Sequence, residues 1–215
     1  MFIVDLPFAP LAILTFLGMC LAVVACFAVV IFAALTGRKK LLQVVSLVLG
    51  GGLGLYTLLL LAASVISDEY LLSRGQEKHF CEVDCHLAYS VQDVQTAAEG
   101  PTLHYKVRLR TRFDENTIGP HRPMDAALYP NPRVLFIVDD AGKRYSAAET
   151  CSDSVGGKPL TTPLVPGESY LTTLCFDVPV GSAQPKLWVM NSTWPNQFLI
   201  GHENSFLHKK VYFRL

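Results

Sequence analysis

Two long stretches without charge constrain this chain more than any other feature of its sequence. Residues 6–37 contain no Asp, Glu, Lys or Arg, and neither do residues 41–67. Each stretch exceeds the roughly 18 apolar residues that mark a membrane-spanning helix. A helix of 25 residues reaches about 37 Å, enough to cross a hydrocarbon layer of about 30 Å with some tilt. The pattern predicts transmembrane helices over residues 11–35 and 41–67, after a short outer N-terminus, residues 1–10.

Three consecutive cations, Arg38-Lys39-Lys40, predict how this pair of helices crosses the membrane. The connecting loop, residues 36–40, is so short that the helices must form an antiparallel hairpin. Clustered Lys and Arg are retained in the cytoplasm, so we expect a cytoplasmic loop and both termini outside a bacterial plasma (inner) membrane. The leader carries an Asp and no basic residue, and the apolar run is too long for a signal peptide, so we expect the first span to remain uncleaved.

Small residues within the two spans are candidates for helix packing in the bilayer. They are Gly18 and Ala22 in the first span and Gly50 and Gly54 in the second, the latter pair in GxxxG spacing. Small side chains let helix backbones approach closely in lipid. The contact is either within the hairpin itself or against another membrane subunit. Neither span contains an ionisable residue that would indicate a proton or ion path.

The polar remainder of the chain has the pattern of an all-β domain. Residues 68–78 read as a juxtamembrane linker, and residues 79–215 as an extracytoplasmic domain. Strand-like runs alternate there with Pro and Gly turn signals, and the run from Leu103 to Phe113 alternates apolar and basic residues. About seven short antiparallel strands without a helical period predict a β-sandwich. We expect Trp188 in its core and Trp194 exposed at a loop.

A family resemblance rests on two neighbouring motifs. The first is Leu164-Val-Pro-Gly-Glu-Ser-Tyr-Leu-Thr-Thr-Leu-Cys-Phe-Asp-Val-Pro179, and the second is Pro185-Lys-Leu-Trp-Val. Together with Tyr89-Ser-Val, they resemble the immunoglobulin-like domain of unknown function that occurs in bacterial membrane-anchored proteins and lipoproteins. The resemblance covers roughly residues 85–215. It implies an immunoglobulin-like sandwich in an extracytoplasmic setting, and it supplies no catalytic residues.

Four cysteines outside the spans are disulfide candidates: Cys81, Cys85, Cys151 and Cys175. If residues 81–85 are extended, the Cα atoms of Cys81 and Cys85 lie about 13 Å apart, which is too far for a bridge. Each would then pair with Cys151 or Cys175, and we expect this cross-domain pattern. A turn at Glu82-Val-Asp84 would instead allow a local Cys81–Cys85 bridge and leave Cys151 with Cys175.

The same segment supports a competing metal-site hypothesis. His79, Cys81, Cys85 and His86 bring together the thiols and imidazoles that suit Cu or Zn. The layout of two spans followed by a β-domain is also similar to cytochrome oxidase subunit II. That family's copper motif continues with His and Met where this chain has Tyr89 and Gln92. The spacing Cys-x3-Cys-His is also one residue longer than a c-type haem motif. The metal hypothesis therefore stays an alternative to the expectation of no cofactor.

Other chemistry is sparse in the sequence. Lys and Arg together number 18, as do Asp and Glu, and this neutrality argues against a nucleic-acid partner. No nucleophile elbow, zinc-protease motif or phosphate-binding loop is present, so we expect no enzyme activity. The Lys106–Arg112 stripe is either a solvated sheet face or a surface for an anionic partner. We therefore expect an interaction or assembly module that binds another membrane or envelope protein. The alternative is a metal- or redox-linked accessory subunit.

Overall fold

The computed structural model describes residues 2–3, 9–80, 86–119, 122–148, 157–191 and 194–215. The chain divides into two compact units. The first, which we call the sandwich unit, consists of Met1–Pro7, Asp68–Thr193 and Lys210–Leu215. The second, the helical unit, consists of Phe8–Ser67 and Trp194–Lys209.

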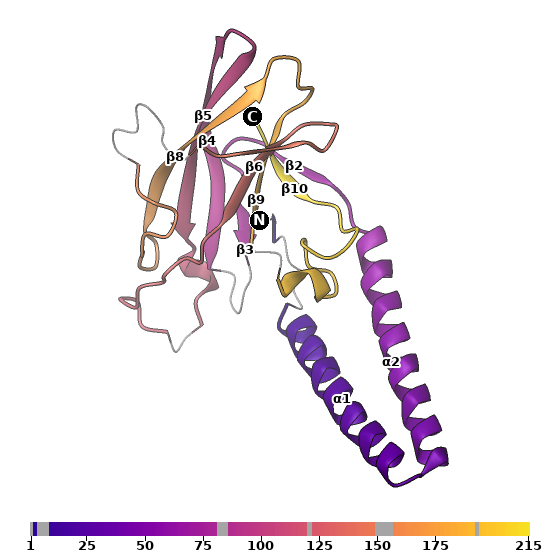
Figure 1. The fold of residues 1–215 in the computed structure, drawn as a ribbon. Coiled ribbons are helices and arrows are strands. Elements are labelled where there is room, and N and C mark those ends of the chain that lie inside the picture. The colour runs from indigo at the N-terminus through magenta and orange to yellow at the C-terminus, as the bar shows by residue number, and fades with distance from the viewer. Residues whose placement is uncertain (1, 4–8, 81–85, 120–121, 149–156, 192–193) are drawn as a thin grey trace. The chain divides into compact units, whose positions relative to one another are not determined.

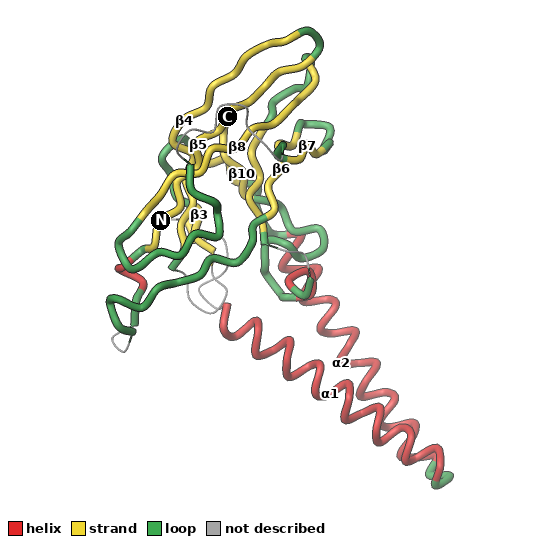
Figure 2. Tube along the Cα trace, turned by 60° about the vertical axis from the view of Figure 1, so that its left-hand side comes forward, coloured by secondary structure: helices red, strands yellow, loops and turns green. Residues whose placement is uncertain are grey.

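Two long helices, α1 (Ala9–Leu35) and α2 (Lys39–Val65), form an antiparallel hairpin in the helical unit (Figures 1 and 2). Both are long and apolar enough to cross a membrane. α1 begins two residues earlier than predicted. α2 both begins and ends two residues earlier than the predicted range 41–67, because Lys39 and Lys40 lie in its first turn instead of in the loop. Gly37, with φ of +68°, ends α1 in the left-handed conformation that favours glycine.

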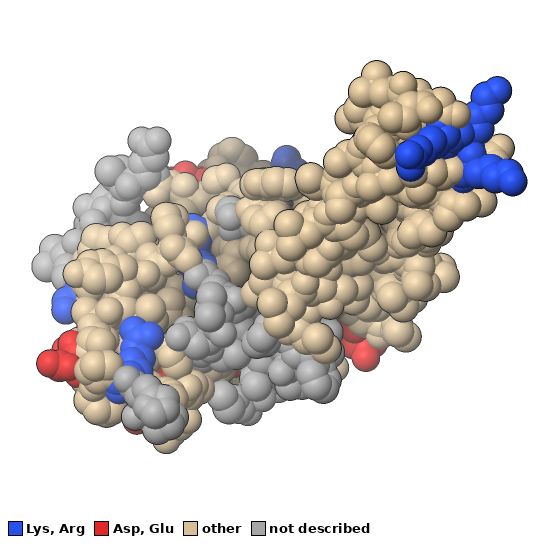
Figure 3. Space-filling model, turned by 90° about the horizontal axis from the view of Figure 1, so that it is seen from below, with Lys and Arg blue, Asp and Glu red and all other residues tan. Residues whose placement is uncertain are grey.

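The surface of the hairpin is apolar up to its tip. In Figure 3 the hairpin is covered by side chains other than Lys, Arg, Asp and Glu, and Lys and Arg gather at its end. The exposed residues Arg38, Lys39 and Lys40 form this basic tip. The amide of Arg38 donates a 2.9 Å hydrogen bond to the carbonyl oxygen of Ala33, which fixes the turn that carries the cations.

The sandwich unit contains two five-stranded sheets. The first has the order β1-β3-β4-β5-β8 and the second the order β2-β10-β9-β6-β7. The strands of the first sheet are β1 (Phe2–Ile3), β3 (Lys78–Phe80), β4 (Leu87–Glu99), β5 (Thr102–Phe113) and β8 (Ser169–Pro179). Those of the second are β2 (Tyr70–Leu72), β6 (Val134–Val138), β7 (Arg144–Ser146), β9 (Lys186–Met190) and β10 (Val211–Arg214).

The main hydrophobic core draws alternate residues from the long strands of both sheets. On β5 the buried residues are Tyr105, Val107, Leu109, Thr111 and Phe113, so the predicted alternation is confirmed there. Phe176 and Val178 of β8 and Leu187 and Val189 of β9 join the same cluster: all four are buried. Trp188 is buried with Val138 and Met190 in a smaller cluster.

The sandwich begins earlier in the chain than the sequence predicted. The segment 68–78, expected to be a linker, contributes β2, whose Leu72 packs into the core at 1% exposure. β2 runs parallel to β10, with Tyr70 opposite Val211, and β1 runs parallel to β3. The described residues contain ten named strands, because β1 and β2 precede the predicted domain and β3 begins at Lys78. The two parallel pairs, β1–β3 and β2–β10, both include one of these earlier strands, and the other strand pairs are antiparallel as predicted.

The predicted outer domain, residues 79–215, also contains a segment that belongs elsewhere. Trp194–Lys209, which includes the 3₁₀ turn η2 (Asn196–Phe198), is part of the helical unit. The hydroxyl of Tyr56 donates a 2.7 Å hydrogen bond to the carbonyl oxygen of Phe198. The amide of Lys209 donates one of 2.8 Å to Oγ of Ser67. This segment therefore packs on the helices.

Candidate functional site

The outer face of the first sheet carries a row of basic side chains. β5 lies between β4 and β8, and its alternate residues Lys106, Arg108, Arg110 and Arg112 point away from the core. This orientation follows from the pleat, because the intervening residues of β5 are buried. The predicted stripe is therefore present as one continuous row along β5, beside the edge strand β8.

Arg112 is neutralised by carboxylates on neighbouring segments. Its Nε and Nη2 atoms each donate a 2.7 Å hydrogen bond to Glu77, and Nη1 lies 3.3 Å from Asp114 and 3.4 Å from Glu115. The hydrogen bond from Arg112 holds the pKa of Glu77 below its usual value, against the effect of burial. Arg112 thus serves the structure of the sheet and leaves little free charge for a ligand.

Asp114 joins the same network from the end of β5. Burial by itself would raise the pKa of Asp114, but hydrogen bonds from Asn116, His79 and Arg112 lower it to about 2. Its Oδ2 lies 3.2 Å from Nε2 of His79. Because these partners come from separate segments, the carboxylate connects β3, β5 and η1 (Glu115–Thr117).

Arg108 and Arg110 differ from Arg112 in their partners. Neither guanidinium forms a hydrogen bond or ion pair with another side chain in the part of the chain that the structure describes. Asp93 lies opposite Arg108 in the strand register, but its Oδ2 accepts a 3.2 Å hydrogen bond from Gln95. Two cationic groups are therefore available on this face.

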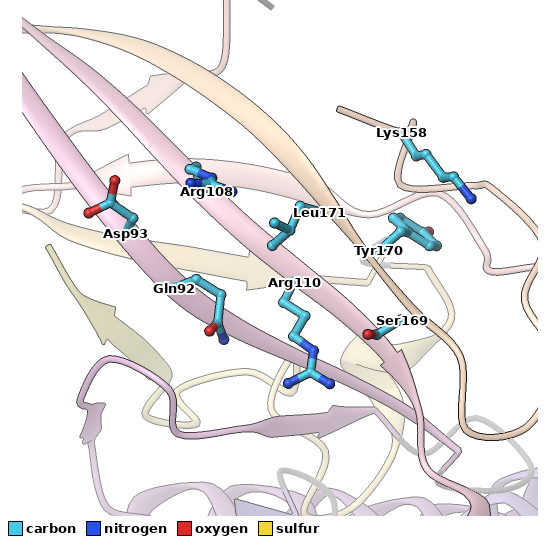
Figure 4. A pocket seen from close by; sticks show the side chains of 8 residues that line it. All are labelled: Gln92, Asp93, Arg108, Arg110, Lys158, Ser169, Tyr170 and Leu171. Carbon is cyan, nitrogen blue, oxygen red and sulfur yellow. The ribbon is translucent and has the colours of Figure 1, made fainter. Parts of the chain in front are cut away.

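A groove of about 650 Å³ surrounds these two arginines. We call it the basic groove; its lining residues are Gln92, Asp93, Arg108, Arg110, Lys158, Ser169, Tyr170 and Leu171. Figure 4 shows Arg108 and Arg110 along β5, with Gln92 and Asp93 on β4 and with Tyr170 and Leu171 on β8. Three cations and one carboxylate line it, so its net charge is +2.

Lys158 reaches the groove from a segment that extends the sheet beyond β8. The amide of Lys158 donates a 2.9 Å hydrogen bond to the carbonyl oxygen of Leu171, and the hydroxyl of Thr172 donates one of 2.6 Å to the carbonyl oxygen of Lys158. A Cβ atom at Gly157 would lie 3.0 Å from the amide nitrogen of Thr173, so glycine permits this close approach. The backbone thereby fixes the third cation beside the sheet.

The chemistry of the basic groove is that of anion binding. Arginine offers planar, paired N–H donors that match carboxylate and phosphate groups, and lysine adds a point charge. Among the described lining residues, Ser169 is the only aliphatic hydroxyl, and neither a His nor a Cys lines the groove with it. The described lining therefore contains no Ser–His or Cys–His pair.

The predicted metal-site residues fall partly outside the described chain. Cys81 and Cys85 lie outside the described residues, and the two histidines have separate partners. His79 is buried beside Asp114, with Nδ1 lacking a hydrogen-bond partner, whereas Nδ1 of His86 lies 2.6 Å from Oγ1 of Thr117. Among the described residues, no three His, Cys, Asp or Glu groups are arranged to hold a metal ion. The metal hypothesis stays a prediction.

The disulfide candidates are also only partly described. Cys175 lies on β8 and is not a free thiol, whereas Cys20 and Cys26 in α1 are free. The carbonyl oxygen of Cys175 accepts a 2.8 Å hydrogen bond from the amide of Ala148. Cys81, Cys85 and Cys151 lie outside the described residues, so the pairing stays a prediction.

The small residues of the spans are not in close contact within the described hairpin. A Cβ atom at Gly18, Gly50 or Gly54 would meet no atom within 4 Å, and Ala22 is exposed. Packing within the hairpin therefore does not account for these three glycines. Contact with another membrane subunit stays a prediction.

Two buried cations were missed by the sequence analysis. Lys78 donates hydrogen bonds from Nζ to the carbonyl oxygens of Val189 and Val211, at 2.7 and 3.1 Å. Arg133 donates to the hydroxyl of Tyr89, and its guanidinium lies 4.5 Å from the ring centre of Phe80. The available signal was the two-residue spacing of Lys78 and Phe80, which puts them on one face of a strand.

Comparisons with known proteins add no family for this chain. No protein-family model matches it, and no curated protein matches it. Among solved structures, it is similar to the secreted protein MPT63 of Mycobacterium tuberculosis, with 11% identity, a TM-score of 0.42 and coverage of 68% of this chain and 98% of the other. An uncharacterized β-sandwich protein of Clostridium difficile has 9% identity, a TM-score of 0.40 and coverage of 69% and 95%. Both TM-scores lie below 0.5, so neither likeness carries an argument about family or function.

Proposed function

We propose that this chain is a membrane-anchored, extracytoplasmic interaction or assembly module without enzyme activity. The helical hairpin anchors it in a bacterial plasma membrane, with loop 36–40 in the cytoplasm. The sandwich unit, of the immunoglobulin-like class, is exposed outside and binds a membrane or envelope protein. The apolar hairpin with its basic tip, Arg38 to Lys40, supports this placement, because such cations are retained on the cytoplasmic side.

The observation that carries the binding role is the pair Arg108 and Arg110 in the basic groove. Neither guanidinium has a described side-chain partner, although neighbouring Arg112 on the same strand is held by three carboxylates. A groove with a net charge of +2 favours an acidic ligand over a neutral one. The partner that fits is an acidic protein segment, whose carboxylates match the arginine donors.

The test is binding of a fluorescent oligoglutamate peptide to the full chain in neutral phosphatidylcholine nanodiscs. We expect the double variant Arg108→Glu and Arg110→Glu to lose at least about tenfold in affinity, because each charge reversal turns attraction into repulsion. The binding of the wild type should also weaken as salt rises. The matched control reverses Arg74 and Arg214, two exposed cations outside the groove, and should change affinity less than about twofold. If both variants lose the same affinity for the peptide, the loss comes from the change in net charge and not from the groove, which would contradict the proposal.

A second candidate is the metal- or redox-linked accessory subunit. The buried Nδ1 atom of His79 has no hydrogen-bond partner, which leaves one ring nitrogen open to a ligand. Together with His86, Cys81 and Cys85, His79 would supply the ligands of a Cu or Zn site. Metal analysis and thiol counting on the purified chain separate the two candidates. Stoichiometric metal with free thiols supports this one, and no metal with oxidised thiols excludes it.

A further inference from the structure

The segment Trp194–Lys209 buries three consecutive polar residues and exposes three large apolar ones, although Leu199 is buried. Glu203, Asn204 and Ser205 are buried. Trp194, Phe206 and Leu207 are 68%, 49% and 71% exposed. A loop surrounded by water normally shows the opposite arrangement. This distribution indicates that the segment lies against an apolar environment.

Hydrogen bonds within the segment hold it in one compact form. The amides of Phe198, Leu199, His202, Ser205 and His208 each donate to a carbonyl oxygen three residues earlier, over 2.9 to 3.2 Å. The amide of Asn204 donates to Nδ1 of His202 at 2.9 Å, and Oγ of Ser205 donates to the carbonyl oxygen of Leu199. Backbone groups paired in this way can enter a poorly hydrated layer at low cost.

Aromatic contacts connect the segment to the hairpin. The ring of Phe198 stacks on Phe16 of α1 at 6.4 Å and meets Trp194 and Phe206 edge-on at 5.6 and 5.7 Å. The carbonyl of Phe198 accepts the hydrogen bond from Tyr56 of α2. In Figure 1 this part of the chain lies between the open ends of the two helices. Phe198 is thus the residue that joins the segment to both helices.

The position of Tyr56 gives the depth of this contact in a bilayer. Tyr56 lies fifteen residues beyond Leu41, which is about 22 Å along the helix axis. If the hydrocarbon layer starts beside the loop cations, its thickness of about 30 Å includes Tyr56. On α2, Leu60 and Ser64 follow Tyr56 at intervals of four residues and are buried, so the same face of the helix continues to be covered.

We propose that Trp194–Lys209 is an interfacial segment that inserts into the outer leaflet of the bilayer, with Trp194, Phe206 and Leu207 contacting lipid. This inference rests on the proposed membrane anchoring and goes beyond it. Tryptophan is enriched at the membrane interface, where its ring meets both headgroups and acyl chains. Leu207 has a φ of +62°, a conformation that costs a leucine energy and that an exposed loop in water would give to glycine or asparagine. The segment thus supplies a second membrane contact beside the spans.

Tryptophan fluorescence in vesicles of brominated phosphatidylcholine tests the proposal. Bromine on the acyl chains quenches only indoles that touch the hydrocarbon. The chain has two tryptophans, and Trp188, at 4% exposure in the sandwich unit, is the internal reference. We expect the full-length wild type to lose about a third of its emission, and Trp194→Phe, which retains Trp188, to lose less than about a tenth.

A third variant separates this inference from the anchoring itself. Phe27 is exposed in the middle of α1, so Phe27→Trp in the Trp194→Phe background reports on the span alone. Quenching of this variant and of the wild type supports both proposals. Quenching of this variant alone overturns the inference and leaves the anchoring proposal intact. If neither is quenched, the anchoring proposal fails and the inference falls with it.

Discussion

The hydroxyl of Tyr56, inside α2, donates a 2.7 Å hydrogen bond to the carbonyl oxygen of Phe198, 142 residues further along the chain. A hydroxyl group within an apolar helix requires a partner, because hydrocarbon offers none. Phe198 provides that partner, and its ring stacks on Phe16 of the other helix. A late segment of the chain therefore completes the structure of the hairpin at the open end, away from the loop.

Replacing Tyr56 by Phe should loosen this segment without unfolding the chain. The substitution removes one hydrogen bond and leaves the carbonyl oxygen of Phe198 without its partner, which costs about 1–2 kcal/mol. Hydrogen exchange should then speed up about fivefold to thirtyfold at the amides of Leu199, His202 and Ser205. Tyr129→Phe, at an exposed position, is the control. Unchanged exchange at these amides would contradict the role of Tyr56.

Replacing Asp114 by Asn should destabilise the sandwich unit. The carboxylate accepts hydrogen bonds from His79, Arg112 and Asn116, and an amide of the same size cannot serve all of these donors. The loss of about 2 kcal/mol corresponds to a fall in Tm of about 6 °C for a domain of this size. Thermal melting of the full chain measures it. Asp125→Asn, at an exposed position, should leave Tm unchanged, and equal effects would contradict the prediction.

The low pKa of Asp114 also predicts an acid-sensitive stability. The folded pKa of about 2 lies below the ordinary value of 3.8, so folding favours the charged form. The resulting stability is complete above about pH 4 and is lost as the pH falls towards 2, because the native carboxylate must then be protonated. A shift of this size corresponds to about 2 kcal/mol. Between pH 4.5 and 2, Tm should fall less steeply for Asp114→Asn than for the wild type. Parallel profiles would show that other groups control acid unfolding.

The sequence predicted those parts of the fold that have a regular period. The absence of charge located α1 and α2 to within two residues. The alternation from Leu103 to Phe113 identified which side chains of β5 face the core, and Trp188 and Trp194 are buried and exposed as expected. These features depend on which residues of a single strand or helix are buried, and the local order of apolar and polar residues in the sequence predicts this.

Features that depend on long-range pairing could not be predicted in this way. β2 has only three residues, and its place at the edge of a sheet depends on pairing with Val211, far along the chain. The packing of Trp194–Lys209 in the helical unit likewise depends on hydrogen bonds to Tyr56 and Ser67, which lie far away in the sequence. The basic row was visible in the sequence, but the neutralisation of Arg112 by Glu77 was not, because 35 residues separate them. No local period encodes such contacts.

The pairing of the four outer cysteines is open to a direct test. Of the four, only Cys175 on β8 lies within the described residues. Ala148, three residues before Cys151, donates its amide hydrogen bond to the carbonyl oxygen of Cys175. We predict the cross-domain pattern, in which Cys81 and Cys85 each pair with Cys151 or Cys175, and the alternative is Cys81–Cys85 with Cys151–Cys175.

Peptide mapping of the oxidised full chain without reduction should join Cys81 and Cys85 each to a peptide that contains Cys151 or Cys175. In the chain-entropy model each of these long loops contributes about 4–5 kcal/mol. Replacing Cys81 and Cys85 together should therefore lower Tm about as much as replacing Cys151 and Cys175 together, because either double substitution removes both bridges. Cys20→Ser, in α1, is the control, because that thiol is free and should leave Tm of the sandwich unit unchanged. A peptide joining Cys81 to Cys85 would contradict the cross-domain pattern and establish the local one. Four free thiols would remove the disulfides altogether and favour the metal hypothesis instead.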